Sequence, residues 1–339
     1  MKFGVLDPRP IPVAESANSA LLGPNTIGIE VTIPTLATRC GRGNIDPQHT
    51  GGDETKTAIE IACEQVESCF EGRPCCGGGW DSYYCPECDG GQQPPYSPER
   101  RWSDAVLVTV RPDLDSVGAM AVYSLAVQGK SLAPAMKRIQ MVATADKFAR
   151  GGYPGPKPLP TRDNPWDESS ATAESSRPLA AIAAAVMDFK VPLADRVVTM
   201  EKWLLTGDEP AQYRTQVEKE RLDMITAMEA GQIKSETRSD GRIAVVESTH
   251  RAATSVGYSL APVVVALNPS FKQGPSEPYK KFTICAFEAK FADIKSALAE
   301  LETLEAGWGG SPTIGGSPQG VSSVLTIDQV VEVVAKYLN

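Results

Sequence analysis

The chain has 339 residues, of which 42% are hydrophobic and 22% are charged, and its formal net charge is −9 at pH 7. This length allows two or three domains with substantial cores, and the negative charge argues against a large basic surface for nonspecific binding of long nucleic acid. No apolar run approaches the roughly 20 residues that span a bilayer, and the first residues lack a secretory signal. We therefore expect a cytoplasmic protein with no membrane partner.

Residues 1–100 are rich in Gly, Pro and Cys, and we expect them to form a module of their own. The stretch TIGIEVTIPTL (26–36) resembles a strand. The stretch ETKTAIEIACEQVESCF (54–70) predicts a helix, because its apolar residues recur at three- and four-residue spacing. The stretch DGGQQPPYSPERRW (89–102) is typical of a linker.

Residues 101–235 predict an α/β domain. AVLVTV (105–110) indicates a buried strand, SVGAMAVYSLAVQG (116–129) a helix ending at Gly129, and RIQMVATAD (138–146) a second strand. A long polar loop, rich in Pro and Ser, covers 150–178. The three helices predicted after it cover 178–189, 193–205 and 210–231.

Residues 236–339 predict a smaller α/β domain. Its strands cover 242–248, 261–268 and 281–289, and its helices 293–305 and 326–338. A Gly-rich loop, GWGGSPTIGGSPQG (307–320), lies between the two helices. Two Gly-Ser-Pro units in this loop favour a specific conformation, because Pro restricts the backbone.

Three aspartates follow the two predicted strands of the central domain. Asp113 and Asp115 come after 105–110, and Asp146 ends 138–146. If these strands are neighbours in a parallel sheet, the three carboxylates meet at its carboxyl edge, where hard cations such as Mg²⁺ or Mn²⁺ would find oxygen ligands. The alternative is local: Asp115 caps the following helix and Asp113 fills a turn.

The stretch VRPDLDSVGAMA resembles the first motif of the DHH phosphoesterase superfamily, which includes RecJ-like nucleases, oligoribonucleases and family II inorganic pyrophosphatases. Asp113 and Asp115 match the aspartates of that motif, and Asp146 matches the lone Asp of the second motif. The resemblance covers about residues 104–339. It implies that Asp113, Asp115 and Asp146 are catalytic metal ligands for Mn²⁺ or Mg²⁺.

The resemblance also extends to the Gly-rich loop of the C-terminal domain. Gly309 and Gly310 match a Gly-Gly-His-Pro loop that binds substrate phosphate in the family, with Ser311 in the place of the histidine. Backbone N–H groups of such a loop can hold an anion. Arg251 is a further candidate for substrate binding, since a guanidinium can pair with phosphate through two hydrogen bonds. The alternative, which the sequence favours, is an ordinary surface arginine.

The chain departs from the family at the histidines. Thr109 stands where the first motif has His, and the chain has no Asp-His-His triplet, since its only histidines are His49 and His250. Three alternatives remain: a site of carboxylates alone, a histidine brought from elsewhere, or a metal centre that has been lost. His49, in the loop CGRGNIDPQHTGGD, is the candidate for a borrowed metal ligand, because neutral imidazole is a common ligand. The alternative is a surface histidine in a polar loop.

Six cysteines within the N-terminal module are candidates for a structural Zn²⁺ site. Thiolates at short spacing can surround a tetrahedral Zn²⁺, and metal binding would fold a module too Gly-rich to be stable alone. The pair in CPEC is the strongest candidate, and an iron–sulfur cluster or a redox pair is the alternative. The six are Cys63, Cys69, Cys75, Cys76, Cys85 and Cys88. Cys40 and Cys285 are expected to be ordinary buried thiols.

Together these features predict an α/β protein with a parallel-sheet DHH-like domain, a smaller C-terminal α/β domain and a zinc-stabilised N-terminal module. The expected function is a metal-dependent phosphoesterase that acts on a nucleotide or a short oligonucleotide. The alternative is a non-catalytic protein on a degenerate DHH-like scaffold, which binds a nucleotide or a partner. The expected ligand is a small phosphate-bearing substrate or a short single-stranded nucleic acid, and a homo-oligomer stays open.

Overall fold

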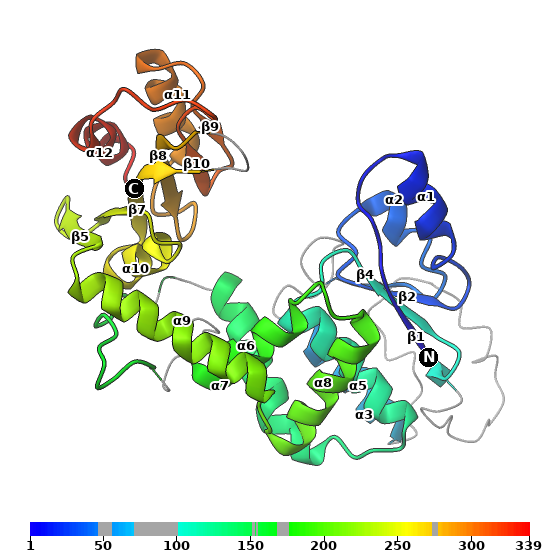
Figure 1. Cartoon of the computed structure of the whole chain (residues 1–339). Helices are drawn as coiled ribbons and strands as arrows, with labels where there is room; N and C mark the ends of the chain where they lie inside the picture. Colours follow the sequence, from blue (N-terminus) through cyan, green and yellow to red (C-terminus); the bar gives the residue numbers. More distant parts are fainter. Residues whose placement is uncertain (47–55, 71–100, 151–152, 154, 168–175, 273–276) are drawn as a thin grey trace. The chain divides into compact units, whose positions relative to one another are not determined.

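The computed structural model describes residues 1–46, 56–70, 101–150, 153, 155–167, 176–272 and 277–339 (Figure 1). These residues form two compact units. The N-terminal unit comprises Met1–Arg150 and Glu168–Val217, and the C-terminal unit comprises Gly151–Asp167 and Glu218–Asn339. None of the helices in the described ranges combines the length and the apolar character that a bilayer crossing requires.

The N-terminal unit is built on a sheet of four parallel strands. They are β1 (Lys2–Val5), β2 (Thr26–Ile29), β3 (Asn44–Ile45) and β4 (Val106–Thr109), in the order β1-β4-β2-β3. The mixed α/β class with a parallel sheet is therefore confirmed. The division at residue 100 is not seen, because three strands from 1–100 pair in one sheet with β4 and none of them forms a separate module.

Helices cover both faces of this sheet. Leu107 of β4 packs with the larger core and the adjacent Val108 with a smaller one, since neighbouring side chains of a strand point to opposite faces. The smaller core lies beside α1 (Pro12–Ser19) and α2 (Pro34–Ala37). The larger core contains side chains of α3 (Ala58–Phe70), α5 (Leu114–Val127), α6 (Met136–Arg150), α7 (Arg177–Val186) and α8 (Leu193–Thr206).

Helices α3 and α5 approach each other closely at Gly118. A Cβ atom at this position would lie 2.7 Å from Cδ1 of Ile59, so only glycine fits without a shift of the isoleucine. The predictions of α3, β4 and α5 are confirmed. The chain leaves α5 through Gly129, whose φ of +67° lies in the left-handed region that favours glycine.

The second strand predicted at 138–146 is wrong, because this segment lies within helix α6. Ile139, Val142 and Ala143 are all buried, and they follow a spacing of three and four residues. That spacing places them on one face of a helix. A short apolar run of this kind fits a strand and a helix equally well by sequence alone. The neighbours of β4 come instead from the first 45 residues of the chain.

The C-terminal unit contains a six-stranded mixed sheet in the order β5-β6-β7-β8-β10-β9. Only the pair β6–β7 is parallel. The strands are β5 (Ile233–Arg238), β6 (Ile243–Ser248), β7 (Val263–Phe271), β8 (Tyr279–Ala286), β9 (Gly309–Gly310) and β10 (Ile314–Gly316). The predicted boundary at 235/236 falls within β5, whereas the two compact units divide inside α9 (Ala211–Glu229).

Each face of the six-stranded sheet carries its own hydrophobic core. One core joins α10 (Ala253–Leu260) and the end of α9 to alternate residues of β6 and β7. The other core joins the opposite residues of these strands to α11 (Ile294–Leu304) and α12 (Ile327–Lys336). The alternation along each strand therefore buries both faces of the sheet.

Candidate functional site

An acidic residue follows every strand of the parallel sheet in the N-terminal unit. Asp7 comes after β1, Glu30 after β2, Asp46 after β3, and Asp113 and Asp115 after β4. The carboxyl ends of parallel strands lie at one edge of the sheet, where open α/β folds bind their ligands. The carboxyl edge of this sheet is therefore the candidate site.

Asp113 is the N-cap of α5. Its Oδ1 accepts hydrogen bonds from the backbone N–H of Ser116 at 3.0 Å and from the hydroxyl of Ser116 at 2.8 Å. The backbone N–H of Asp113 donates in return to Oγ of Ser116 at 3.0 Å. This reciprocal capping box satisfies amides that the first turn of a helix leaves unpaired. The capping role predicted for Asp115 thus belongs to Asp113.

Asp115 caps a different helix, and it does so from the first turn of α5. Its side chain is 1% exposed, and its two oxygens accept hydrogen bonds from the amides at the start of α3. The distances are 2.7 Å from N of Ala58 to Oδ2 and 3.0 Å from N of Ile59 to Oδ1. The positive end of the α3 dipole also favours a carboxylate at this place. Asp115 therefore links the start of α3 to the first turn of α5 through these two hydrogen bonds.

Glu30 lies immediately after β2, in the left-handed region of the backbone with φ of +52°. A non-glycine residue there is uncommon and adds strain. Burial and the negative charges of four aspartates together raise the pKa of the Glu30 carboxyl to about 9, and burial has the largest effect. In order of effect, these aspartates are Asp115, Asp113, Asp146 and Asp46.

Asp115 is perturbed in the same direction. Burial, followed by the charge of Asp146, raises its pKa to about 7, while the hydrogen bonds from Ile59 and Ala58 favour the ionised form and oppose the rise. Asp146 lies in α6 and not at a strand end, yet its charge acts on both Asp115 and Glu30. We call Glu30, Asp46, Asp113, Asp115 and Asp146 the carboxylate cluster.

Glu30 and Asp46 are members of the cluster that the sequence predictions missed. Each follows a short apolar strand that ends in Ile, TIGI for Glu30 and NI for Asp46. The same pattern of an apolar strand followed by an acid drew attention to Asp113. Asp46 is the third residue of the NIDPQH segment, whose first two residues form β3, so β3 brings the start of that segment to the carboxyl edge. His49 itself lies outside the described residues.

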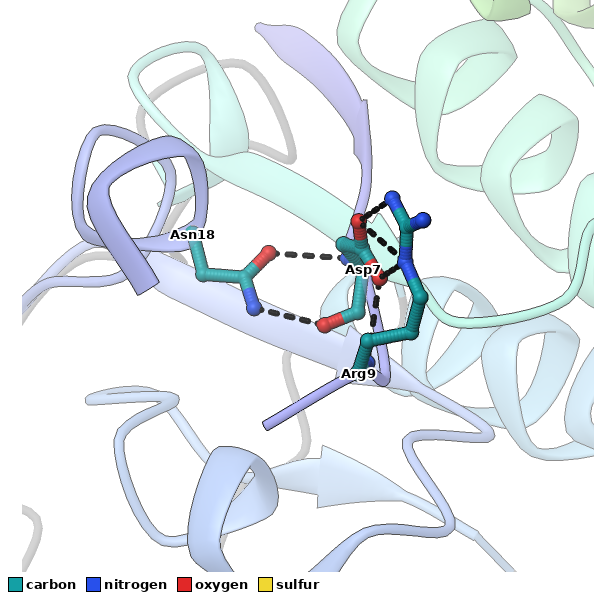
Figure 2. A network of polar contacts seen from close by, with 3 residues as sticks. All are labelled: Asp7, Arg9 and Asn18. Atoms are coloured by element: carbon teal, nitrogen blue, oxygen red, sulfur yellow. Dashed lines mark hydrogen bonds and ion pairs between the residues drawn. The ribbon is translucent and has the colours of Figure 1, made fainter. Parts of the chain in front are cut away.

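Asp7, after β1, is held by a cation. Figure 2 shows its carboxylate against the guanidinium of Arg9, with Nε at 2.9 Å from Oδ1 and Nη2 at 2.5 Å from Oδ2. These hydrogen bonds lower the pKa of the Asp7 carboxyl to about 2. Asn18 bonds to the backbone N–H and carbonyl of Asp7 on the other side, at 2.8 Å each.

The donor atoms of the carboxylate cluster fit a hard divalent cation. Carboxylate oxygens are the ligands that Mg²⁺ and Mn²⁺ prefer, and burial, together with neighbouring carboxylates, raises the pKa values of Glu30 and Asp115. Within the residues that the structure describes, however, no three His, Cys, Asp or Glu side chains come together closely enough to hold a metal ion.

Only Cys63 and Cys69 of the six candidate zinc ligands lie among the described residues. Both are buried on α3 in the larger core. Burial, with the charges of Glu67 and Glu64, raises the pKa of the Cys63 thiol to about 12, which disfavours the thiolate that a metal needs. Sγ of Cys69 accepts a hydrogen bond from Arg101 at 3.2 Å. Cys75, Cys76, Cys85 and Cys88 lie outside the described residues.

Zinc binding by the Cys-rich segment stays a prediction with a direct measurement. We expect about one zinc ion per chain by elemental analysis of protein purified without chelators. Cys88→Ser should reduce this content. Cys285→Ser is the matched control, because Cys285 is buried in the core of the C-terminal unit. Protein without zinc or iron, or a Cys88→Ser variant with unchanged zinc, would contradict the prediction.

The candidate substrate residues of the C-terminal unit have structural partners. Gly309 and Gly310 form β9, and Gly310 packs so closely on Ile314 and Gly315 that a side chain would collide with their backbone. Ser311 closes the hairpin, with its N–H 2.7 Å from the carbonyl of Ile314 and its hydroxyl accepting from the N–H of Ile314 at 3.2 Å. The Gly-rich loop thus adopts a specific conformation, as predicted.

Arg251, the remaining candidate for substrate binding, is exposed on the C-terminal unit. Its guanidinium forms an ion pair with Glu220 at 2.6 Å. The two side chains are 69% and 36% exposed, so this is a surface pair that water and salt weaken. Cys40 and Cys285 are both buried thiols, as predicted.

Comparison with known proteins adds no identification to this geometry. No family model matches the chain, and no curated protein resembles it significantly in sequence.

Proposed function

We propose that the chain is a metal-dependent phosphoesterase that acts on a nucleotide or a short single-stranded oligonucleotide. The observation that carries this proposal is the carboxylate cluster at the carboxyl edge of the parallel sheet. Glu30 and Asp115 both have raised pKa values there, because burial and neighbouring carboxylates disfavour their charged forms.

Such a cluster is costly for folding. Buried carboxylates lose hydration, and like charges at short range repel each other, so each ionised member raises the cost of the next. Helix capping accounts for Asp113 and Asp115, whereas the charges of Asp146 and Asp46 act on the buried carboxyl of Glu30. A divalent cation is the ligand that would compensate several carboxylates at once.

Asp113, Asp115 and Asp146, together with Glu30, are the residues that would hold Mn²⁺ or Mg²⁺. When bound, such an ion polarises a phosphoryl oxygen and lowers the pKa of a water ligand. The chain itself fixes two of these carboxylates by hydrogen bonds: Asp113 through the capping box and Asp115 through the amides of α3. Held side chains lose little entropy when a ligand binds.

The test is an assay of purified protein with Mn²⁺ or Mg²⁺ against nucleotides, cyclic dinucleotides and oligonucleotides of two to five bases, with separation of the products. We expect release of mononucleotide or phosphate. Glu30→Gln should lower the rate about 100-fold or more, since it removes one charge near the reacting group without a change of shape. Glu15→Gln is the control, because Glu15 is an exposed carboxylate of the same unit.

A non-catalytic function is the second candidate, and one observation favours it. In the described ranges no three potential ligands are placed to hold a metal, and Asp113 and Asp115 already serve as helix caps. Protein that binds nucleotides but turns over no substrate with either metal would establish this alternative, a nucleotide- or partner-binding protein on the same scaffold.

A further inference from the structure

Two arginines follow neighbouring strands at the carboxyl edge of the sheet in the N-terminal unit. Arg9 lies beyond β1 and Arg111 beyond β4. These strands pair in parallel, with Val5 opposite Thr109, and the N–H of Leu6 donates to the carbonyl of Thr109 at 2.8 Å. The two segments that carry the arginines therefore start side by side at the end of the sheet.

The backbone that carries Arg9 is fixed by a buried polar side chain. Asn18 is 3% exposed, and its amide pairs with both backbone groups of Asp7. Asp7 then holds the guanidinium of Arg9 through Nε and Nη2, and also accepts from the backbone N–H of Arg9 at 3.0 Å. In Figure 2 the third guanidinium nitrogen points away from Asp7. Arg9 is thus oriented, with donors left for a ligand.

The backbone that carries Arg111 is fixed in a similar way. Its N–H donates to Oγ1 of Thr109 at 3.3 Å, and its carbonyl accepts from the hydroxyl of Ser116 at 3.3 Å. Thr109 and Ser116 are both fully buried. The Arg111 side chain is exposed, and within the described parts of the chain no acidic group pairs with it. Buried polar groups are costly unless bonded, and here they hold a loop with an unpaired cation.

We infer that Arg9 and Arg111 form a phosphate subsite, which binds a terminal phosphate monoester of the substrate that does not itself react. This inference rests on the proposed function and adds a substrate class: nucleotides or short oligonucleotides that carry a terminal phosphate. Guanidinium groups match phosphate geometry through paired hydrogen bonds. The cluster of carboxylates would repel such a substrate without cations beside it.

The order of the strands places Arg9 at one end of the sheet and Glu30 and Asp46 toward the other. In the sheet β1-β4-β2-β3, Arg9 follows β1, Arg111 follows β4 together with Asp113 and Asp115, Glu30 follows β2, and Asp46 follows β3. Adjacent strands are about 4.8 Å apart, so β1 and β2 differ by about 10 Å. A phosphate bound at Arg9 therefore lies away from Glu30, and the bond to be hydrolysed would be a different one.

The test measures binding without metal or catalysis. Adenosine 5′-monophosphate and adenosine are each titrated into the full-length protein in EDTA by calorimetry. We expect the monophosphate to bind at least about tenfold more tightly than adenosine, and Arg9→Ala and Arg111→Ala each to weaken it about tenfold. Arg39→Ala is the matched control, since Arg39 is a surface arginine of the same unit that pairs with Glu15.

Arg111→Lys distinguishes phosphate binding through two parallel hydrogen bonds from binding through positive charge alone. It keeps the charge but cannot form the planar pair of hydrogen bonds, so we expect it to recover only part of the affinity. Arg111→Ala should melt at the wild-type temperature, because the side chain is exposed and unpaired in the described structure. If Arg9→Ala fails to fold, the Arg111 variants still decide the outcome.

Equal affinity for adenosine and its monophosphate, or monophosphate binding that both alanine variants leave intact, would overturn the subsite. The proposed function fails separately. Protein that binds the monophosphate through these arginines but hydrolyses nothing supports the subsite and contradicts the phosphoesterase. Protein that hydrolyses oligonucleotides, with rates and monophosphate affinity unchanged in both variants, supports the enzyme and contradicts the subsite.

Discussion

Asp115→Ala is expected to lower the free energy of unfolding by about 2–4 kcal/mol in metal-free buffer. The substitution leaves the backbone N–H groups of Ala58 and Ile59 without their acceptor, and both residues are 0% exposed. Each buried donor without a partner costs about 1–3 kcal/mol. Relief of the repulsion between Asp115 and Glu30 offsets part of this loss. Denaturant unfolding followed by circular dichroism measures the difference.

Asp113→Ala is the comparison for this result. It removes an N-cap from a half-buried position, which costs about 1 kcal/mol. Asp115→Asn should fall between the two alanine variants, since an amide keeps one of the two acceptor oxygens. An Asp115→Ala variant as stable as Asp113→Ala would show that the bonds to α3 contribute little.

Without metal, the N-terminal unit is expected to lose stability as the pH rises from about 5 to about 9. The folded-state pKa values of Glu30, about 9, and Asp115, about 7, lie above their ordinary values of 4.5 and 3.8. In this window the folded state therefore keeps protons that the unfolded state has released. Stability falls with pH wherever the folded state binds more protons.

Glu30→Gln should flatten this dependence at its alkaline end, because the amide keeps the shape of the side chain and does not ionise. The measurement is the midpoint of denaturant unfolding in EDTA at about pH 5, 7 and 9. Glu15→Gln, on the exposed surface of the same unit, should leave the profile unchanged. A wild-type midpoint that rises with pH over this range would contradict the raised pKa values.

Mn²⁺ should reverse the trend. A cation binds the ionised carboxylates, so its binding releases protons and becomes tighter as the pH rises. The gain in melting temperature at saturating Mn²⁺ should be small at about pH 5 and several degrees at about pH 8, at roughly 2–4 °C for each kcal/mol. Glu30→Gln should reduce this gain. A gain that is independent of pH would place the metal elsewhere in the chain.

Several elements of the fold were predictable because their signals are local. The apolar spacing of 54–70 indicates α3, and the run AVLVTV indicates β4. The helix of small residues after Asp113 is α5, and the chain leaves it through Gly129, the glycine at which the sequence predicted its end. The same kind of local pattern, a buried strand followed by acidic residues, predicts that Asp113 and Asp115 lie at the carboxyl edge of the sheet.

The error at 138–146 and the missed Glu30 have one physical origin. RIQMVATAD suits either a strand or a helix, and its neighbours in space decide between them: it packs against α3, α5 and α8, while residues 1–45 supply the partners of β4. Glu30 carries no motif. Its importance comes from charges that lie 16 to 116 residues away in the chain and are brought together only by folding.

The sequence by itself determined the α/β class of the chain and the position of Asp113 and Asp115 after a buried strand. Both follow from preferences for strands, turns and helix caps, which act over a few residues. The tertiary structure alone decided what those aspartates do. Asp113 caps its own helix, whereas Asp115 caps α3 from 57 positions away. Burial and the convergence of charges from four separate segments then raise the pKa values of Glu30 and Asp115, because electrostatic interactions depend on distance through space and not along the chain.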